Sequence, residues 1–353
     1  MGKKKTILVA PLHWGLGHAT RCIPIINSLL DHGFNVIIAS DGSALLLLQK
    51  EFSKLNTIEL PSYNISYPKK GAHFKWKIFL KLPRILKVIS SEKKIVQELV
   101  SEARIDGIIS DNRFGIRSDK VPSVYLSHQL NVLSGSTSNF SSKRHQNIIK
   151  KFTECWVPDF EGSENLSGKL GHLDKDSIKP KYIGILSRMK KKDLEKKYDV
   201  LVLLSGPEPQ RSFLEKKMIL VFRWQKKSVL LIQGCVGSQQ EVVRLGNLTI
   251  CNYMNSKELE DAINESEVIV SRSGYTSIMD LAAIGKKAFF IPTPGQFEQE
   301  YLAKRMEKLK MAPYCQQDEF TIDKLEEINS YKGMYSNNPT LNYTTLFNLF
   351  EAE

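Results

Sequence analysis

Short, continuous apolar runs alternate along this chain with longer segments whose apolar residues recur every three or four positions. The first run covers residues 6–12, and the segment that follows, residues 19–32, carries Ile23, Ile26 and Leu29 at helical spacing. A continuous run of this length is typical of a buried strand, and the spacing of three and four is typical of an amphipathic helix. The pattern therefore predicts a strand followed by a helix.

The same alternation continues to the end of the chain. Strands are predicted at residues 35–40, 57–60, 107–110, 123–126, 153–157, 199–204, 228–233, 248–251, 267–271 and 288–292, and helices at 44–51, 84–100, 256–264, from about 275, and within 339–353. Strands that alternate with helices indicate α/β architecture with parallel sheets. Residues 179–197 are rich in lysine and weakly patterned, so we interpret them as the connection between two domains.

Length and composition agree with a globular protein of about two domains. The chain has 353 residues, of which 42% are hydrophobic and 25% charged. Its formal net charge of +12 favours an anionic partner, which charge alone leaves open between a nucleotide, a nucleic acid and an acidic membrane surface.

Cysteine usage and hydropathy indicate the cellular compartment in which the protein resides. The five cysteines are scattered without a Cys-x-x-Cys pair, which indicates a reducing compartment and argues against a zinc site or a disulfide framework. No apolar run approaches the length needed to span a bilayer. The apolar run after Lys3–Lys5 is too short for a signal peptide. We therefore expect a cytoplasmic protein.

The most informative polar segment follows the strand predicted at 267–271. A small-residue turn at 272–274 (Arg-Ser-Gly) leads into a helix at about Tyr275, with Thr276 and Ser277 in its first turn and Asp280 about one turn later. Backbone N–H groups and the helix dipole at such a start bind phosphate. A carboxylate one turn further along can accept hydrogen bonds from ribose hydroxyls.

A second strand, loop and helix follow at once, over residues 288–300. Gln296 lies in the loop, and Gln299 and Glu300 lie on the helix. Because the carboxyl ends of parallel strands meet at one edge of a sheet, we expect these side chains beside the turn at 272–274. Together the two segments are typical of half of a nucleotide-sugar site. Ordinary capping of two tight turns is the alternative.

A glycine-containing loop also follows the first strand, at residues 13–18 (His-Trp-Gly-Leu-Gly-His). A strand, loop and helix at each end of the chain suggest two nucleotide-binding folds with a cleft between them. His18 stands at a helix N-terminus, where the dipole lowers the pKa of an imidazole, so it is a candidate general base; capping or packing is the alternative. Asp111, after the strand 107–110, is expected at the same edge as a second base or a helix cap.

In the order of these motifs the chain resembles the GT-B glycosyltransferases and, among them, the MurG-like members of family 28. The resemblance is weak in sequence but spans nearly the whole chain. It is carried by residues 15–18 (Gly-Leu-Gly-His), 128–131 (His-Gln-Leu-Asn), 184–188, 205–206 (Ser-Gly), 272–274 with Asp280, and 299–300 (Gln-Glu). The Arg-Ser-Gly unit is the most specific of these.

The resemblance implies an α/β fold of two Rossmann-like, doubly wound domains facing across a cleft. Residues 1–185 would form the acceptor-side domain and residues 186–336 the donor domain, and residues 337–353 would form a helix that returns to the first domain. The implied reaction is an inverting, metal-independent transfer of a sugar, such as an N-acetylhexosamine, from a UDP-sugar to a hydroxyl on a lipid-linked or glycan acceptor. No cofactor beyond the UDP-sugar substrate is implied.

The resemblance also assigns site residues. His18 or Asp111 would be catalytic, and no metal ligand is implied. The donor-binding residues would be Gly15, Gly17, Asn131, Arg188, Ser205, Gly206, Tyr253, Arg272, Ser273, Gly274, Tyr275, Thr276, Ser277, Asp280, Gln296, Gln299 and Glu300.

Three positions depart from the pattern of the family. Asp280 replaces a glutamate that is one methylene longer, and Glu300 replaces a glutamine that reads sugar hydroxyls. Residues 207–209 (Pro-Glu-Pro) replace a flexible glycine-rich segment. All three bear on the identity of the donor sugar.

Three other functions are compatible with the same elements. A NAD-dependent oxidoreductase is suggested by Gly15 and Gly17 before a helix and by Asp41 after the next strand, although Thr20 stands at the third glycine position. A UDP-sugar epimerase shares the architecture. A non-catalytic nucleotide-sugar binding protein is the third.

A basic segment suggests contact with a membrane. Residues 69–94 contain nine lysines and arginines with Glu92 as the only acid, and aromatic residues are interleaved among them. Such a stretch attracts an anionic membrane surface, whereas a solvated helix with an apolar inner face is the alternative. Nucleic acid is not expected, because no recognised binding module is present. We therefore expect peripheral contact with the inner face of the membrane.

Overall fold

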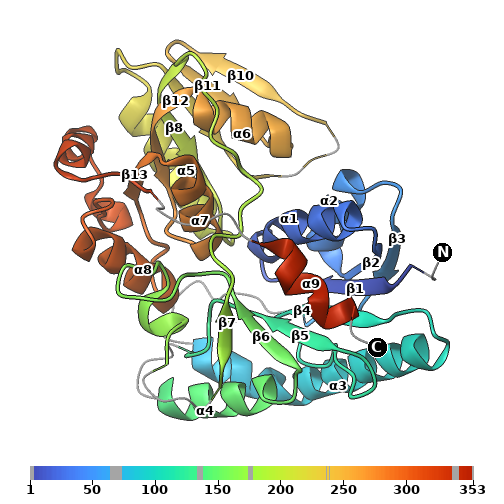
Figure 1. Ribbon diagram of the computed structural model, residues 1–353. Helices are drawn as coiled ribbons and strands as arrows, with labels where there is room; N and C mark the ends of the chain where they lie inside the picture. The colour runs from blue at the N-terminus through green and yellow to red at the C-terminus, as the bar shows by residue number, and fades with distance from the viewer. Residues whose placement is uncertain are drawn as a thin grey trace. The chain divides into compact units, whose positions relative to one another are not determined.

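The computed structural model describes residues 4–63, 74–132, 138–173, 178–235, 237, 239–335 and 342–351, and for residues 74–82, 138 and 139 it describes the backbone only. The chain forms two compact units (Figure 1). The first unit contains the described residues up to Leu186 together with residues 342–351, and the second contains the described residues from Ser187 to residue 335. Among the helices of these described ranges, none is long and apolar enough to cross a bilayer.

The first unit is built on a parallel sheet with strand order β3-β2-β1-β4-β5-β6-β7. Its elements are β1 (Thr6–Pro11), α1 (Gly17–Asp31), β2 (Asn35–Ser40), α2 (Gly42–Glu51), β3 (Asn56–Glu59), α3 (Phe74–Ser101), β4 (Gly107–Asp111), β5 (Ser123–Leu126), α4 (Ser138–Ile149), β6 (Glu154–Val157), the 3-10 turn η3 (Gly168–Leu170), β7 (Pro180–Tyr182) and α9 (Tyr343–Glu351). The order reverses between β1 and β4. In open α/β sheets ligands bind at such a switch point, outside the carboxyl ends of the strands.

The central strand β1 explains why this sheet is buried on both faces. Ile7, Leu8, Val9 and Ala10 are all completely buried. A strand with an apolar residue at every position cannot leave one face in water, so both faces must be covered by helices.

The last helix, α9, packs on the first unit. The ring of Phe347 lies edge-on to Phe34, and the ring of Phe350 lies edge-on to Trp156. A Cβ atom at Gly107 would stand 2.5 Å from the Phe350 ring, so only glycine lets the helix approach β4 this closely. The C-terminal segment is therefore part of the core of the first unit.

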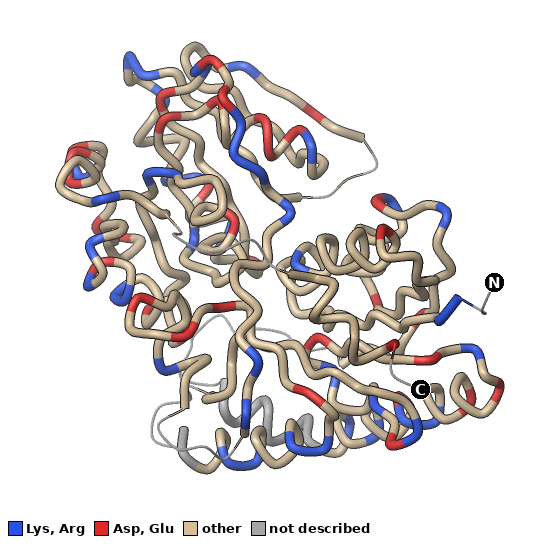
Figure 2. The backbone as a smooth tube through the Cα atoms, in the orientation of Figure 1, with Lys and Arg blue, Asp and Glu red and all other residues tan. Residues whose placement is uncertain are grey.

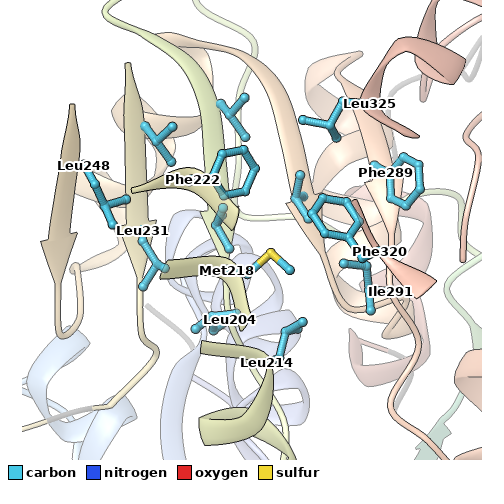
Figure 3. Packing of buried hydrophobic residues seen from close by; sticks show 14 of the residues in the cluster. Leu204, Leu214, Met218, Phe222, Leu231, Leu248, Phe289, Ile291, Phe320 and Leu325 are labelled. Atoms are coloured by element: carbon cyan, nitrogen blue, oxygen red, sulfur yellow. The ribbon is translucent and has the colours of Figure 1, made fainter. Parts of the chain in front are cut away.

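The second unit has a separate sheet with strand order β10-β11-β9-β8-β12-β13, in which β10 is an antiparallel edge strand. Its elements are β8 (Tyr198–Leu203), α5 (Gln210–Phe222), β9 (Val229–Ile232), β10 (Val242–Leu245), β11 (Leu248–Cys251), α6 (Ser256–Asn264), β12 (Ser266–Ser271), α7 (Tyr275–Ile284), β13 (Lys287–Phe290), α8 (Phe297–Lys308), and the 3-10 segments η4 (Gln317–Glu319) and η5 (Ile322–Ser330). One face of the sheet packs against α5 and η5 through the side chains labelled in Figure 3. The switch point of this sheet lies between β8 and β12.

The predicted fold class, two α/β units each with its own parallel-rich sheet, is confirmed. Two strands were not predicted from the sequence. They are β7, which lies inside the lysine-rich segment 179–197, and β10. Both are edge strands with polar or exposed residues, and β10 is exposed at all four positions. An edge strand with one partner does not need the buried apolar run that marks a central strand.

Candidate functional site

In the first unit, a histidine and a carboxylate meet at the switch point. His18 is the second residue of α1, which follows β1, and Asp111 is the last residue of β4, the neighbour of β1. Their side chains pair, with 2.8 Å between His18 Nδ1 and Asp111 Oδ1. Asp111 is fully buried, whereas the His18 side chain is 15% exposed. The imidazole therefore has a solvent-facing part, and the carboxylate has none.

Arg21, one turn further along α1, holds this carboxylate from inside the protein. Its Nε donates to Asp111 Oδ2 at 2.5 Å, its Nη2 pairs with Asp111 Oδ1, and its Nη1 lies 2.9 Å from His128 Nδ1. Burial alone would raise the pKa of Asp111, but Arg21 and His18 together hold it well below its usual range. Asp111 is therefore an ionised carboxylate with its oxygens engaged.

The same surroundings keep His18 neutral. Burial lowers the pKa of His18 and the Arg21 guanidinium lowers it further, against the opposing pull of Asp111. Arg21 Nη2, which can only donate, also lies 2.9 Å from Nδ1, so Nδ1 accepts from Arg21 in one tautomer. In the other tautomer Nδ1 donates its proton to Asp111, and Nε2 then keeps its lone pair. Nε2 has no hydrogen-bond partner among the described residues. The pair thus provides a neutral, oriented imidazole whose Nε2 can accept a proton.

A second buried network lies beside this pair, at the carboxyl end of β2. Asp41 pairs with the fully buried Arg113 and with His13 Nδ1 at 3.2 Å. Arg113 also binds Glu92 of α3 at 2.9 Å. Asp41 also accepts a hydrogen bond from the Ser62 side chain, so its three partners are all protein groups. Asp41 is thus not presented to a ribose as it would be in a dinucleotide-binding fold.

Three predicted donor residues lie in the first unit. Gly15 lies in the loop before α1 with φ of +85°, a left-handed conformation that favours glycine, and Gly17 opens α1. The Asn131 amide instead donates to the carbonyl oxygens of Lys169 at 2.7 Å and His172 at 3.3 Å. The Asn131 side chain therefore holds the backbone around residues 169–172 within the first unit.

In the second unit, the predicted donor residues gather at the carboxyl edge of the sheet. Ser205 and Gly206 follow β8, Tyr253 follows β11, residues 272–277 follow β12, and Gln296 follows β13. Ser205 is exposed, and Gly206 has φ of +102°. Since β8 and β12 are neighbours on either side of the switch point, this edge is where a ligand of an α/β sheet is expected.

The start of α7 is built for close approach by a ligand. Gly274 occupies the N-cap position in an extended conformation and makes no side-chain capping bond. The buried Ser273 donates its hydroxyl to the carbonyl of Gln299 at 2.8 Å, which ties the turn to α8. Tyr275 is buried, whereas Thr276 and Ser277 are partly exposed. The backbone amides of such a first turn and the positive end of the helix dipole are the groups that bind anions at helix N-termini in general.

Arg272, predicted to bind the donor, turns its side chain into the protein. Its guanidinium is completely buried and donates to the carbonyls of Ile291, Pro292 and Gln210 and to Gln317 Oε1, at 2.7–3.1 Å. Burial lowers the pKa of Arg272 to about 10, which still leaves it charged at neutral pH. Its contacts join the ends of β12 and β13 to α5 and η4, and thereby shape the turn before α7.

Asp280 lies at the centre of a small polar cluster. Ser187 Oγ donates to Asp280 Oδ1 at 2.5 Å, and Arg188, whose Nη1 donates to Ser256 Oγ at 2.6 Å, lies close enough to act on Asp280 electrostatically. Burial raises the pKa of Asp280 to about 6, and Arg188 and Ser187 limit the rise. The carboxylate is therefore ionised at neutral pH and becomes neutral in mild acid.

Hydrogen bonds between its own residues stabilise the segment 293–300. Gln299 accepts a hydrogen bond from the Thr293 amide at 2.8 Å and donates to Gln296 Oε1 at 2.7 Å, and Glu300 accepts from the Gly295 amide at 3.1 Å. Gln299 and Glu300 thus hold the loop in shape. The Thr293 hydroxyl is buried and has no hydrogen-bond partner among the described residues, and it lies 3.6 Å from where a Cβ at Gly206 would lie.

Sequence reasoning missed three residues that the structure brings to the site. Arg21 follows His18 by three positions, a spacing that places two residues on one helix face and was the available signal. Ser187 contacts Asp280 only through the fold, and no local pattern marks it. Thr293 lies within the segment 288–300 that was assigned to the site, but it was not singled out as a site residue. Of the basic segment 69–94, residues 69–73 and the side chains of 74–82 lie outside the described residues; Arg84, Lys87, Lys93 and Lys94 are exposed on α3.

Comparison with known proteins agrees with this geometry. Residues 206–342 match the model of the glycosyltransferase family 28 C-terminal domain. A Pasteurella multocida protein named UDP-N-acetylglucosamine--N-acetylmuramyl-(pentapeptide) pyrophosphoryl-undecaprenol N-acetylglucosamine transferase is 22% identical over 338 residues, 92% of this chain and 88% of that protein. A Sulfurihydrogenibium protein of the same name is 26% identical over 129 residues, so the chain spans only 36% of its length.

Solved structures show the same fold. The glycosyltransferase of kitacinnamycin superposes with a TM-score of 0.61 at 14% identity, covering 93% of this chain and 90% of that one. Acinetobacter baumannii MurG superposes with a TM-score of 0.51 at 15% identity, covering 99% and 92%. The two α/β units therefore form a GT-B fold, the fold of a large class of glycosyltransferases.

Within that class, residues 206–342 match the C-terminal domain of the family 28 glycosyltransferases, and the chain is similar along most of its length to the Pasteurella multocida transferase. The residues matched by the family model, 206–342, include the turn before α7, Asp280 and the loop before α8. The match therefore covers most of the predicted donor-binding residues of the second unit.

Proposed function

We propose that the protein transfers a sugar from a UDP-sugar to the hydroxyl of a lipid-linked acceptor. The observation that carries this proposal is the coincidence of the family 28 match with the anion-binding start of α7 and its nearby carboxylate. Relatives of this chain are named as transferring N-acetylglucosamine from UDP to an acceptor on pyrophosphoryl-undecaprenol. UDP-N-acetylglucosamine is accordingly the proposed donor.

The second unit would hold the donor. The diphosphate would sit against the first-turn amides of α7, near Thr276 and Ser277, where the helix dipole favours negative charge. Asp280 would accept hydrogen bonds from the ribose hydroxyls. Arg188, close to Asp280, would balance the charge that develops as UDP leaves. No step in this scheme needs a metal ion.

The first unit would supply the base. His18 Nε2 would take the proton of the acceptor hydroxyl while the hydroxyl oxygen attacks the anomeric carbon and UDP departs, which inverts that carbon in one step. Asp111 would hold the proton-bearing Nδ1 and stabilise the imidazolium that forms. Because Asp111 is fully buried and engaged by Arg21, it suits this supporting role better than the role of base.

The alternatives have less support from particular residues. An NAD-dependent oxidoreductase would need Asp41 for the ribose, and Asp41 is engaged by Arg113 and His13. An epimerase of the same fold and a non-catalytic binding protein would also use the start of α7, but neither gives the His18–Asp111 pair a role in transfer. Peripheral contact of residues 69–94 with an anionic membrane stays part of the proposal.

The test is donor turnover. Purified protein is incubated with a panel of UDP-sugars and an undecaprenyl-pyrophosphoryl glycan acceptor, and released UDP and glycosylated lipid are measured by mass spectrometry. We expect equal amounts of UDP and product lipid with UDP-N-acetylglucosamine, in the presence of a metal chelator. NADH formation, or interconversion of UDP-sugars without transfer, would contradict the proposal.

A further inference from the structure

The outer face of α5 in the second unit exposes large apolar side chains. Phe213, Leu220 and Trp224, which follows the helix, are 52%, 72% and 81% exposed. The interval of seven residues places Phe213 and Leu220 on one side of α5, and Trp224 comes directly after the C-cap residue Arg223. The opposite side of α5 buries Leu214 and Met218 in the core (Figure 3). A helix whose core side is satisfied does not need these exposed side chains for folding.

Basic side chains surround these apolar ones. Lys216, Arg223, Lys226 and Lys227 are exposed around them, and the Arg223 guanidinium lies 4.8 Å from the centre of the Trp224 ring. Figure 2 shows basic and acidic residues distributed over both units. The acid on α5 itself, Glu215, is neutralised by Arg211 at 2.6 Å. The acids Asp318 and Glu319 lie beyond Lys217, whose Nζ donates to the Asp318 carbonyl.

The β10–β11 hairpin lies next to the C-terminal end of α5. Its turn is fastened to the end of α5, because the Asn247 side-chain amide donates to the carbonyls of Phe222 at 3.0 Å and Lys227 at 2.8 Å. Leu245, next to the turn, is 40% exposed, and Val242 and Val243 are 54% and 52% exposed. The exposed edge strand β10 is therefore attached through its turn to the end of α5.

We propose that this face, defined as Phe213, Leu220 and Trp224 with Lys216, Arg223, Lys226 and Lys227, rests in the headgroup region of an anionic membrane. Isolated apolar residues on a surface are ordinary, but a group bordered by cations marks an interaction site. Tryptophan favours the membrane–water boundary, and lysine and arginine stems bury their carbons while their charges reach anionic headgroups. An acidic membrane complements both properties.

This inference goes beyond the proposed transfer, because it concerns the second unit and requires neither donor nor acceptor. Its failure would leave the proposed function intact, and the reverse also holds. It also differs in place from the basic segment 69–94, so that the two contacts are separable by substitution.

The test uses the full-length protein with vesicles of phosphatidylcholine alone and with about one third phosphatidylglycerol. We expect co-sedimentation with the anionic vesicles only, weakened by salt, and a blue shift of tryptophan emission on binding. The shift should disappear in Trp224→Phe, which keeps an apolar ring and so keeps most of the binding. A blue shift that persists in Trp224→Phe would assign the contact to another tryptophan and overturn the proposal.

A matched pair of substitutions tests the apolar contact. Leu220→Ser should weaken partitioning about tenfold, the effect of losing one leucine from an apolar phase. Leu46→Ser, on α2 of the first unit, removes an equally large side chain that is 58% exposed and should leave partitioning unchanged. Circular dichroism checks that both variants are folded. Equal partitioning of the two variants, or no binding of the wild type to either vesicle, would contradict the proposal.

Discussion

At the scale of single residues, the proposed mechanism depends on Nε2 of His18 as the proton acceptor. His18 Nδ1 faces Asp111, and the surroundings hold the imidazole neutral, so Nε2 is available to take a proton. The burial that lowers the pKa of His18 extends its neutral form to more acidic pH than an ordinary histidine allows. The acidic limb of the activity–pH profile should therefore lie below the ordinary histidine pKa of about 6.5.

Replacing this histidine gives the first residue-level prediction. His18→Ala should lower the turnover rate at saturating UDP-sugar by about 10²–10⁴ and abolish the acidic limb of that rate, because general-base assistance is lost. Donor affinity, measured by UDP titration, should be nearly unchanged, since the donor contacts are assigned to the second unit. His32→Gln, at the exposed far end of the same helix, is the control. Survival of the turnover rate with only a higher acceptor Michaelis constant would make His18 a positioning residue.

The predictability of the site also differs from residue to residue. His18 and Asp111 were predicted at one sheet edge because both follow central parallel strands, and the structure pairs them. Arg21 was missed because a buried arginine on an apolar helix face is recognisable only from its partner. Arg272 was assigned to ligand binding from its motif, yet its length lets it reach carbonyls on other elements instead. Side-chain direction is a tertiary property that a motif does not encode.

At the scale of secondary structure elements, Arg272 connects four of them. Its guanidinium joins the ends of β12 and β13 to α5 and η4 while completely buried. Arg272→Met should therefore lower the free energy of unfolding by about 2–4 kcal/mol, because several buried carbonyl oxygens lose their charged donor. Urea denaturation measures this. Arg223→Met, at an exposed position, should change the stability by less than about 0.5 kcal/mol. Equal stabilities would show that Arg272 is not structural.

Most central elements were predictable from hydrophobic pattern. The strand 123–126 and the helix 256–264 were predicted with the bounds observed, and β1 and the start of α7 within one or two residues. The pattern works there because a strand buried on both faces must be apolar throughout. The edge strands β7 and β10 were missed because their residues are partly or fully exposed, so these strands do not need a continuous apolar run.

At the scale of the whole molecule, the proposed tasks fall to different units of the chain. The His18–Asp111 pair lies in the first, and the start of α7 with Asp280 lies in the second. The family 28 match falls in the part of the chain that supplies the second. Donor recognition is therefore the part of the account with the most support, and it can be tested without knowing the acceptor.

Titration calorimetry of the protein with UDP and, separately, with NAD tests the central claim most directly. The account predicts that UDP binds at pH 7.5 and NAD does not. Asp280→Asn, which keeps the size of the side chain and removes its charge, should weaken UDP binding by about 1–2 kcal/mol. Binding to the wild type should also weaken as the pH falls below about 6, where Asp280 becomes protonated. Binding of NAD without UDP, or UDP affinity that is unchanged in folded Asp280→Asn, would contradict the account.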